Sequence, residues 1–245
     1  MSKMNISLVI PTFNRTDFVI DSFIRVLNNE VIDEIIIVDD SSNYEVYAKL
    51  FILVNDLQNK KVKVFRNKKN LGPLLNKYEA VKRSSNDWCI LLDSDNIIGS
   101  DYVKIIEGLK KEDDVLYCPE VLWREVDKKK IAFNYDKFRK LIISKNNAKN
   151  YIGTELFETW LNTGNYFFNK NAYLKVIEEN KLEDQLMIND AIYFSYLWLL
   201  SGNRMKIVPE LMYIHRVHKG SWYKRNKHVC SRISMAVRKK LKILC

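Results

Sequence analysis

Residues 88–96, Trp-Cys-Ile-Leu-Leu-Asp-Ser-Asp-Asn, decide the fold that this sequence predicts. The first five form a continuous apolar run, which is typical of a strand buried on both faces of a parallel sheet. Asp93 and Asp95 follow at once, at the carboxyl end of the strand, where parallel α/β sheets bind ligands. Carboxylates this close repel each other unless a cation compensates them, and hard oxygen ligands suit Mg²⁺ or Mn²⁺. The stretch therefore predicts a buried strand that ends in a metal site, with a helix cap as the structural alternative.

The chain before this stretch contains further buried strands, which alternate with helices. Strands are predicted at residues 6–10, 34–38, 62–65 and 88–92, with helices between them at residues 17–27, 44–57 and 74–83. Short β-branched runs that alternate with helical patterns indicate βαβ units, and hence a mostly parallel sheet flanked by helices. The second strand, like the fourth, runs directly into acids, Asp39 and Asp40. The sequence thus predicts an α/β fold with two acidic strand ends.

The second half of the chain has a weaker periodicity, and we place a lobe boundary near residues 96–120. Its predicted elements are helices at residues 102–109, 172–179 and 190–200 and strands at residues 115–118 and 166–168. Pro119 is expected to end the strand before it, because proline cannot donate to a ladder. Ser201 and Gly202 are expected to close the last of these helices.

Composition limits the class of protein. A chain of 245 residues with 47% hydrophobic residues can bury one sizeable core, and a net charge of +10 favours anionic partners. The four cysteines form no CxxC pair, which fits a reduced, cytoplasmic protein. No apolar run approaches the roughly 20 residues of a membrane span. We therefore expect a cytoplasmic protein without a transmembrane anchor, peripheral to a membrane at most.

Residues 224–245 differ from the rest of the chain. They contain eight Lys or Arg and no Asp or Glu. Apolar residues recur every three or four positions, at Val229, Ile233, Val237, Leu241 and Leu244. This pattern predicts a basic amphipathic helix, which either lies on an anionic membrane or packs on the domain or on a second subunit of a homodimer.

Four ordered motifs resemble those of the family 2 glycosyltransferases of the GT-A fold. They are SLVIPTFNR at residues 7–15, VDDSS at 38–42, NLGPLLNKYEAV at 70–81 and LLDSDN at 91–96. The resemblance covers the N-terminal half well and extends more loosely to about residue 222. It implies a Rossmann-like, GT-A type sheet with a smaller acceptor-side lobe. It also implies an enzyme that transfers sugar from a nucleoside diphosphate with inversion.

The resemblance also implies a domain plan. A single GT-A domain is expected over residues 1–223, with a nucleotide-binding half at 1–100 and an acceptor-binding half at 101–223. The basic helix at residues 224–245 follows it.

Carried over residue by residue, the resemblance implies a donor site at the strand ends. The residues expected at the nucleotide are Pro11, Thr12, Arg15, Asp39, Asp40, Asn70, Gly72, Asp93, Ser94 and Arg216. Asp40 is expected to contact the base or ribose, with Asp39 supporting it. The family commonly has Gly where Ser41 and Ser42 stand here, so the base contact is expected to be shaped differently.

The resemblance implies a metal cofactor as well, Mn²⁺ or Mg²⁺. Asp93 and Asp95 match the metal-binding motif, with Asp95 as the direct ligand. Similar enzymes carry a histidine-containing segment that completes the metal site, and His218 is the candidate. Arg216 and Lys219 are expected to neutralise the leaving phosphate. A solvated basic loop is the alternative for this segment.

Inverting transfer needs a carboxylate that takes the proton of the acceptor hydroxyl. In similar enzymes this base begins a helix that ends in Gly, and Asp190 fits that pattern. Its neighbour is Asn189, where the family often has Glu. Glu183 and Asp184 are the rival pair, and a helix N-cap is the structural account of Asp190.

The acceptor side can be described by composition alone. Residues 162–166 and the side chains of Trp123, Trp160 and Trp222 offer hydroxyl partners and stacking faces for a sugar. Most large aromatic residues are core residues, so we expect about two of the three tryptophans to be structural.

Together these inferences predict a metal-dependent inverting glycosyltransferase. Its donor is a nucleoside-diphosphate sugar, with UDP favoured over GDP and dTDP, and its acceptor is a hydroxyl of a glycan or of a lipid-linked molecule. Two other classes stay open. One is a degenerate GT-A protein that binds nucleotide without transfer, because the Glu beside Asp190 is missing. The other is a basic nucleic-acid-binding protein, which is disfavoured because it leaves the acidic strand ends unexplained.

Overall fold

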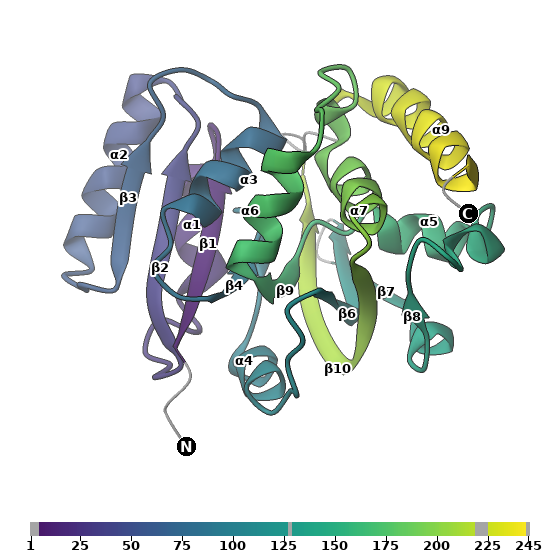
Figure 1. Ribbon diagram of the computed structural model, residues 1–245. Helices are drawn as coiled ribbons and strands as arrows, with labels where there is room; N and C mark the ends of the chain where they lie inside the picture. Colours follow the sequence, from purple (N-terminus) through teal and green to yellow (C-terminus); the bar gives the residue numbers. More distant parts are fainter. Residues whose placement is uncertain (1–4, 127–128, 219–224, 244–245) are drawn as a thin grey trace.

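A single mixed sheet runs through the computed structural model, which describes residues 5–126, 129–218 and 225–243. Its strands are β1 (Ile6–Thr12), β2 (Ile32–Asp39), β3 (Val62–Arg66), β4 (Trp88–Leu91), β5 (Asn96–Ile97), β6 (Val115–Val126), β7 (Lys129–Asn134), β8 (Ile142–Ile143), β9 (Tyr166–Asn169) and β10 (Arg204–Val217). The order across the sheet is β3-β2-β1-β4-β9-β6-β10-β5, with β7 beside β6 and β8 beside β10 (Figure 1). The predicted α/β class is confirmed.

The first four strands of the chain are parallel. β1 pairs with both β2 and β4, and β2 pairs with β3. All seven residues of β1 and seven of the eight in β2 are buried, as strands covered on both faces require. Because the strands are parallel, their carboxyl ends meet at one edge, which is where Asp40 and Asp93 lie.

The second half joins this sheet through an antiparallel strand. β9 lies between β4 and β6 and pairs antiparallel with both. β6 and β10 then pair in parallel, and β10 pairs antiparallel with β5 and β8. The chain just before β9 is therefore carried to the carboxyl end of β4.

Helices pack on this sheet from both halves of the chain. They are α1 (Thr16–Phe23), α2 (Tyr44–Asp56), α3 (Pro73–Lys82), α4 (Ser100–Glu107), α5 (Glu155–Leu161), α6 (Lys170–Glu179), α7 (Asp190–Leu200) and α9 (Lys227–Ile243), with short 3₁₀ turns η1 (Asp136–Phe138), η2 (Ala148–Tyr151) and η3 (Met187–Asn189). α3 contacts α6 and α7, while α2 lies at the far end of the sheet over β3 (Figure 1). Of the helices described, none combines the length and the apolar character that crossing a bilayer requires.

Two predicted element boundaries are wrong. Pro119 does not end its strand, because β6 continues to Val126. The proline falls between the part of β6 that pairs with β9 and the part that pairs with β7, and a register shift against β10 follows it. The proline is therefore tolerated inside the strand at a point where the pairing of β6 changes. The helix predicted to reach residue 27 ends at Phe23, and the chain goes on in turns in which the Val26 N–H donates to the Phe23 carbonyl.

The predicted C-terminal helix forms as α9. Its buried side chains are Cys230, Ile233, Val237 and Leu241, and the helix contacts α7, η2 and η3. Figure 1 shows α9 beside α7, on the outside of the fold. The apolar stripe thus packs on the domain itself.

A buried carboxylate ties the parallel strands together at the edge opposite the site. Glu34 in β2 accepts hydrogen bonds from Ser7 Oγ of β1 at 2.7 Å and from Lys63 Nζ of β3 at 2.9 Å, and also from the Ser85 N–H before β4. Burial alone would raise the pKa of Glu34, but these donors outweigh it and lower the pKa below its ordinary value. Four neighbouring strands therefore depend on one ionised side chain.

We predict that Glu34→Gln lowers the free energy of unfolding by about 2 kcal/mol at neutral pH, because it removes the buried anion to which Ser7, Lys63 and the Ser85 N–H donate. A group with a lowered folded pKa stabilises above its unfolded pKa, and this stabilisation is lost as pH falls through the folded pKa. The gap between wild type and variant in urea unfolding should therefore close below about pH 4. A gap that is unchanged across this range would contradict the assignment.

Candidate functional site

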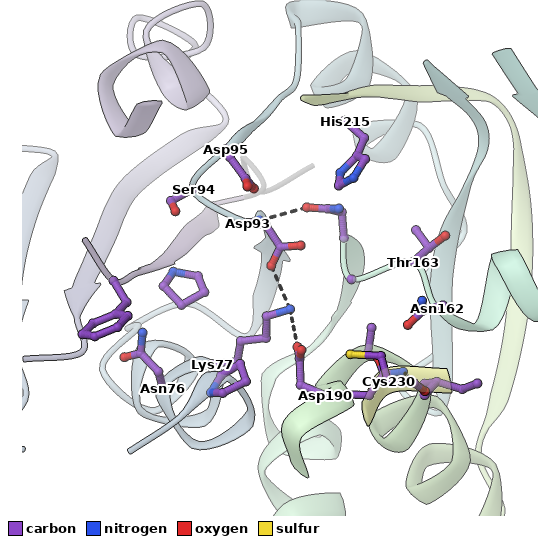
Figure 2. Close-up of a pocket in the computed structure, with 18 of the residues that line it drawn as sticks. Asn76, Lys77, Asp93, Ser94, Asp95, Asn162, Thr163, Asp190, His215 and Cys230 are labelled. Carbon is purple, nitrogen blue, oxygen red and sulfur yellow. Dashed lines mark hydrogen bonds and ion pairs between the residues drawn. The ribbon is translucent and has the colours of Figure 1, made fainter. Parts of the chain in front are cut away.

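A cavity of about 590 Å³ opens at the carboxyl ends of β1, β2 and β4. Its lining comes from both halves of the chain. The N-terminal half contributes the loops after these strands and the first turns of α3, and the other half contributes the end of α5, the start of α7, β10 and the inner side of α9. Figure 2 shows side chains from these elements directed toward a common space.

Most residues predicted at the nucleotide or at the metal line this cavity. They are Pro11, Thr12, Arg15, Asp40, Asn70, Gly72, Asp93, Ser94 and Asp95, joined by Asp190 from the other half. Asp39, Arg216 and His218 do not line it. The sequence motifs thus meet at one site, although these three predicted residues are not part of its lining.

Asp40 organises the loop between β3 and α3. Its carboxylate accepts hydrogen bonds from Asn67 Nδ2 at 2.8 Å and from the backbone N–H groups of Leu71 and Gly72, both at 2.9 Å. Gly72 has a φ of 82°, a region that favours glycine. Three of the roughly four acceptor positions of the carboxylate are therefore used to shape the loop, and about one is left for a ligand.

Asp39 points away from the cavity and holds the loop after β2. Its carboxylate accepts hydrogen bonds from the Ser42 N–H at 3.0 Å and from Ser42 Oγ, and it lies 3.4 Å from Arg66 Nε. Ser41 has a φ of 61°, so the position where the family commonly has Gly adopts a backbone that favours Gly. Asp39 therefore shapes the loop after β2 and does not itself line the cavity.

The centre of the site is a lysine between two carboxylates. Lys77 Nζ of α3 lies 2.8 Å from Asp93 Oδ1 and 2.6 Å from Asp190 Oδ2 (Figure 2). The lysine side chain is 9% exposed. Burial would lower the pKa of Lys77, but the two carboxylates outweigh it and raise the pKa well above its ordinary value. Lys77 therefore remains an ammonium that joins the end of β4 to the start of α7.

Asp93 has a more mixed environment. Burial raises its pKa, Lys77 opposes this, and the negative charges of Asp190 and Asp95 reinforce it, so that the pKa lies above its ordinary value. The Asp93 N–H donates to Asn165 Oδ1 at 2.9 Å, which ties the segment after β4 to the segment before β9 (Figure 2).

The backbone before β9 passes very close to this ion pair. A Cβ atom at Gly164 would lie 2.9 Å from Asp93 Oδ2 and 2.9 Å from Lys77 Nζ. Real Cβ atoms do not approach other atoms this closely, so only glycine fits without moving the pair. Gly164 is thus part of the site although it carries no functional group.

Asp95 is buried and paired with two other cationic or polar groups. Its Oδ2 lies 2.8 Å from Arg15 NH1 and 3.0 Å from His218 Nε2. Burial would raise the pKa of Asp95, but the hydrogen bond with His218 and the charge of Arg15 outweigh it and lower the pKa. The ring of His218 also packs on Phe18 at a centroid distance of 4.4 Å.

The predicted metal ligands fit a divalent ion in part. Asp95 and His218 are adjacent and bring one carboxylate and one imidazole together, both competent ligands for Mn²⁺. Asp93, in contrast, is turned to Lys77. Within residues 5–126, 129–218 and 225–243, no three His, Cys, Asp or Glu side chains are grouped closely enough to hold a metal.

Arg216 is held by the fold. Its guanidinium donates to the Asp95 carbonyl at 2.6 Å, to the Phe18 carbonyl at 2.9 Å and to Asp21 Oδ2 at 3.0 Å. These contacts fasten β10 to α1 and to the segment that carries Asp95. Three of its five N–H groups are therefore already used within the protein.

The candidates for the base separate clearly in space. Asp190 begins α7 and lines the cavity. Glu183 lies 2.9 Å from Lys240 of α9, and Asp184 is exposed, so both lie outside the cavity lining. The geometry favours Asp190. Asn189 beside it donates to the Cys230 carbonyl and Ser234 Oγ, both at 3.2 Å, which joins η3 to α9.

The predicted sugar-stacking residues are mostly absent from the cavity. Trp160 is fully buried and stacks on Phe138 at 5.6 Å, so it is a core residue. Trp123 does not line the cavity, and Trp222, like the end of the histidine-containing segment, lies outside the described residues. Thr163 and Asn165, from the predicted segment 162–166, do line it.

Sequence reasoning missed Lys77, which is central to the geometry. Its signal was present, because residue 77 falls at helical spacing from Leu74, Ala80 and Val81, which are all buried. A lysine on the buried face of a helix needs an anionic partner. Gly164 carried no comparable signal, since the approach that requires it involves residues remote in sequence.

The fold and the site define a class: a GT-A sheet with carboxylates at the ends of its parallel strands. Residues 7–177 match the family described as Glycosyl transferase family 2. The chain belongs to that family.

Curated relatives are distant. The chain is 24% identical over 160 residues to the abequosyltransferase RfbV of Salmonella typhimurium, covering 58% of this chain and 48% of the relative. It is 22% identical over 207 residues to the uncharacterized glycosyltransferase MG060 of Mycoplasma genitalium, covering 82% and 65%. The chain therefore spans about half to two thirds of the length of these two relatives.

Solved structures share the fold. S. aureus TarS 1-349 in complex with UDP-GlcNAc superposes with a TM-score of 0.65 at 18% identity, covering 98% of this chain and 70% of that one. GalNAc-T7 with UDP, GalNAc and Mn²⁺ superposes with a TM-score of 0.64 at 15% identity, covering 89% and 45%. At such identities the likeness shows the fold alone.

We predict that Gly164→Ala costs about 1–3 kcal/mol of unfolding free energy, because the added methyl group must displace the Lys77–Asp93 pair. Gly99→Ala is the matched control, since a Cβ there meets no atom within 4 Å and its φ is −110°. The control should change stability by less than about 0.5 kcal/mol. Equal effects of the two substitutions in urea unfolding would show that the close approach is unimportant.

Proposed function

We propose that this chain transfers a sugar from a nucleoside-diphosphate sugar to a hydroxyl group of a glycan or lipid-linked acceptor, with inversion. Family membership supports the reaction class, and UDP is the favoured nucleotide because TarS and GalNAc-T7 were solved with UDP or a UDP-sugar. The observation that carries the proposal is the position of Asp190. One ammonium group joins it to Asp93, so that a carboxylate of the acceptor half faces the donor-side motif.

Asp190 is the proposed general base. An inverting transfer requires the acceptor oxygen to attack the anomeric carbon from the face opposite the leaving diphosphate, while a carboxylate takes its proton. Asp190 and the donor-side residues line the same cavity from different elements, so a sugar bound in that cavity would lie near both. Lys77 holds the Asp190 carboxylate in place through their ion pair.

Arg15 and Lys77 are the proposed cationic partners of the donor. Both line the cavity, and both now neutralise carboxylates of the motif after β4. Preorganised cations of this kind stabilise the negative charge that builds on a leaving diphosphate. Asp40 and the loop that contains Asn70 and Gly72 would bind the nucleoside. Asp40 would do so through the one hydrogen-bond acceptor position that the loop does not use.

Asp95 and His218 are the residues that would hold a divalent ion, and Asp93 would order Lys77 beside them. When bound, such an ion neutralises charge on the leaving diphosphate. The adjacent carboxylate and imidazole support this assignment, and so does the Mn²⁺ in the GalNAc-T7 structure.

We predict that Asp190→Asn lowers turnover by about 10²–10⁴-fold, the usual contribution of a general base, because the amide cannot accept the proton. Binding of the donor nucleotide should change little. Release of nucleoside diphosphate from UDP-, GDP- and dTDP-sugars measures the first quantity, and calorimetry with UDP measures the second.

Glu183→Gln and Asp184→Asn are the matched controls for this experiment, since each removes one acid of the rival pair outside the cavity. Both should keep near-normal turnover. If either of them, and not Asp190→Asn, abolishes release, the base has been assigned wrongly. A wild-type chain that binds UDP but releases no nucleotide from any donor would instead indicate a nucleotide-binding protein without transfer.

For the metal, we predict that Asp95→Asn weakens the binding of Mn²⁺ in the presence of UDP by at least about tenfold, because it removes the charged ligand. His218→Gln should weaken it less, since an amide oxygen can replace one ligand. Titration of free Mn²⁺ by electron paramagnetic resonance reports this directly. Asp184→Asn is the control, because that exposed carboxylate lies outside the cavity. Unchanged Mn²⁺ binding in Asp95→Asn would remove the metal role.

A further inference from the structure

The C-terminal helix α9 has two faces of different character. The inner face is apolar and packs on the domain. Along the outer face runs a stripe of exposed residues at alternating steps of four and three positions, which places them on one side of a helix. We call it the outer stripe; its members are His228, Arg232, Met235, Lys239 and Lys242.

Most of the net charge of the protein is concentrated in this region. Residues 224–245 contain eight of the forty Lys and Arg and none of the thirty Asp and Glu, so they carry eight of the ten net positive charges. The rest of the chain is nearly balanced. The positive charge of this protein is therefore a local feature and not a general property of its surface.

Five of the six Lys and Arg residues of α9 divide between two tasks. Arg238 pairs with Glu158 of α5, and Lys240 lies 2.9 Å from Glu183, so these two fasten the helix to the domain. Arg232, Lys239 and Lys242 face outward, and no carboxylate in the described part of the chain forms an ion pair with them. Their charge is therefore available to an external anion.

We propose that the outer stripe of α9 is a docking surface for a membrane that contains anionic lipid headgroups. Basic residues near such a surface each contribute a favourable interaction that salt screens. The apolar face of α9 is already buried in the domain, so the helix adsorbs by charge and does not insert as a free amphipathic helix would. Met235, 49% exposed within the stripe, and Ile243, 81% exposed at its end, add apolar contact with the interface.

The composition of α9 favours lipid over nucleic acid. Single-stranded nucleic acids are bound by basic grooves in which aromatic side chains stack on bases. Residues 225–243 contain no Phe, Tyr or Trp, and the stripe lies on a convex helix face. An exposed methionine between basic residues suits a headgroup layer better than a phosphodiester backbone.

Docking on this face has a consequence for the cavity. The inner side of α9 lines it through Cys230, Ser234 and Arg238. The helix therefore stands between the cavity and the proposed membrane surface, with one face toward each. This inference does not require glycosyl transfer, because it depends only on the charge and exposure of α9.

Vesicle co-sedimentation tests the proposal. The full chain is mixed with vesicles of phosphatidylcholine alone or of phosphatidylcholine with phosphatidylglycerol. We expect binding to the anionic vesicles only, and release at about 0.5 M salt, where screening is strong. The triple variant Arg232→Gln, Lys239→Gln, Lys242→Gln should bind at least about tenfold more weakly, given the contribution of each basic residue at such a surface.

The matched control removes three exposed lysines elsewhere, as Lys60→Gln, Lys104→Gln, Lys110→Gln, and so lowers the net charge equally. It should keep binding within about twofold of wild type, since its charges lie off the stripe. Equal loss in both triples would mean that net charge alone acts, and equal binding to neutral vesicles would remove the role of charge; either result overturns the proposal. Displacement from the vesicles by an oligonucleotide at equal phosphate concentration would assign the stripe to nucleic acid instead.

Thermal unfolding of both triple variants checks that they fold. Because all six side chains are exposed, melting temperatures should stay close to wild type. The salt dependence of the wild-type chain tests the proposal without any substitution.

Discussion

The shared ammonium group of Lys77 is the contact on which the rest of the site depends. It compensates two carboxylates, Asp93 and Asp190, that are 97 positions apart in the sequence. Removing one partner from a buried ion pair leaves an unpaired charge, which costs several kcal/mol. One side chain thus fixes the distance between the end of β4 on the donor side and the start of α7 on the acceptor side. The pairing of the strands would not fix this distance by itself.

The topology explains why this contact is possible. Because β9 is antiparallel and lies beside β4, the residues that enter β9 arrive where β4 ends. Asn165 then bonds to the Asp93 backbone, and Gly164 passes with no room for a side chain. α7 is placed from the other side by its packing on α3. Parallel strands supply the acids, and the inserted antiparallel strand supplies the scaffold that encloses them.

The sequence predicted the N-terminal half of the fold well, because continuous apolar strands and helical periodicities are local signals. It placed Asp40, Asp93 and Asp190 at one site through motifs and family resemblance. The contacts of Arg216 could not be foreseen, since its partners are fixed by tertiary packing, whereas Asp39 bonds mainly to Ser42, three residues later. Arg216 in particular bonds to α1, some two hundred residues earlier in the chain. Pro119 does not end its strand, because β6 changes pairing partners at that point, and this change also depends on tertiary structure.

The net charge of the chain does not describe the charge of its cavity. The cavity is lined by four Arg or Lys residues and five Asp or Glu residues: Arg15, Lys77, Arg225, Arg238, Asp40, Asp93, Asp95, Glu158 and Asp190. Several of these form ion pairs with one another, so the cavity walls are close to neutral before any ligand binds. A diphosphate entering it must compete with carboxylates for Arg15 and Lys77. Most of the net positive charge of the chain lies in residues 224–245, and of these only Arg225 and Arg238 are among the lining residues named above. The net charge therefore describes mainly the outer face of α9 and not the chemistry of the cavity.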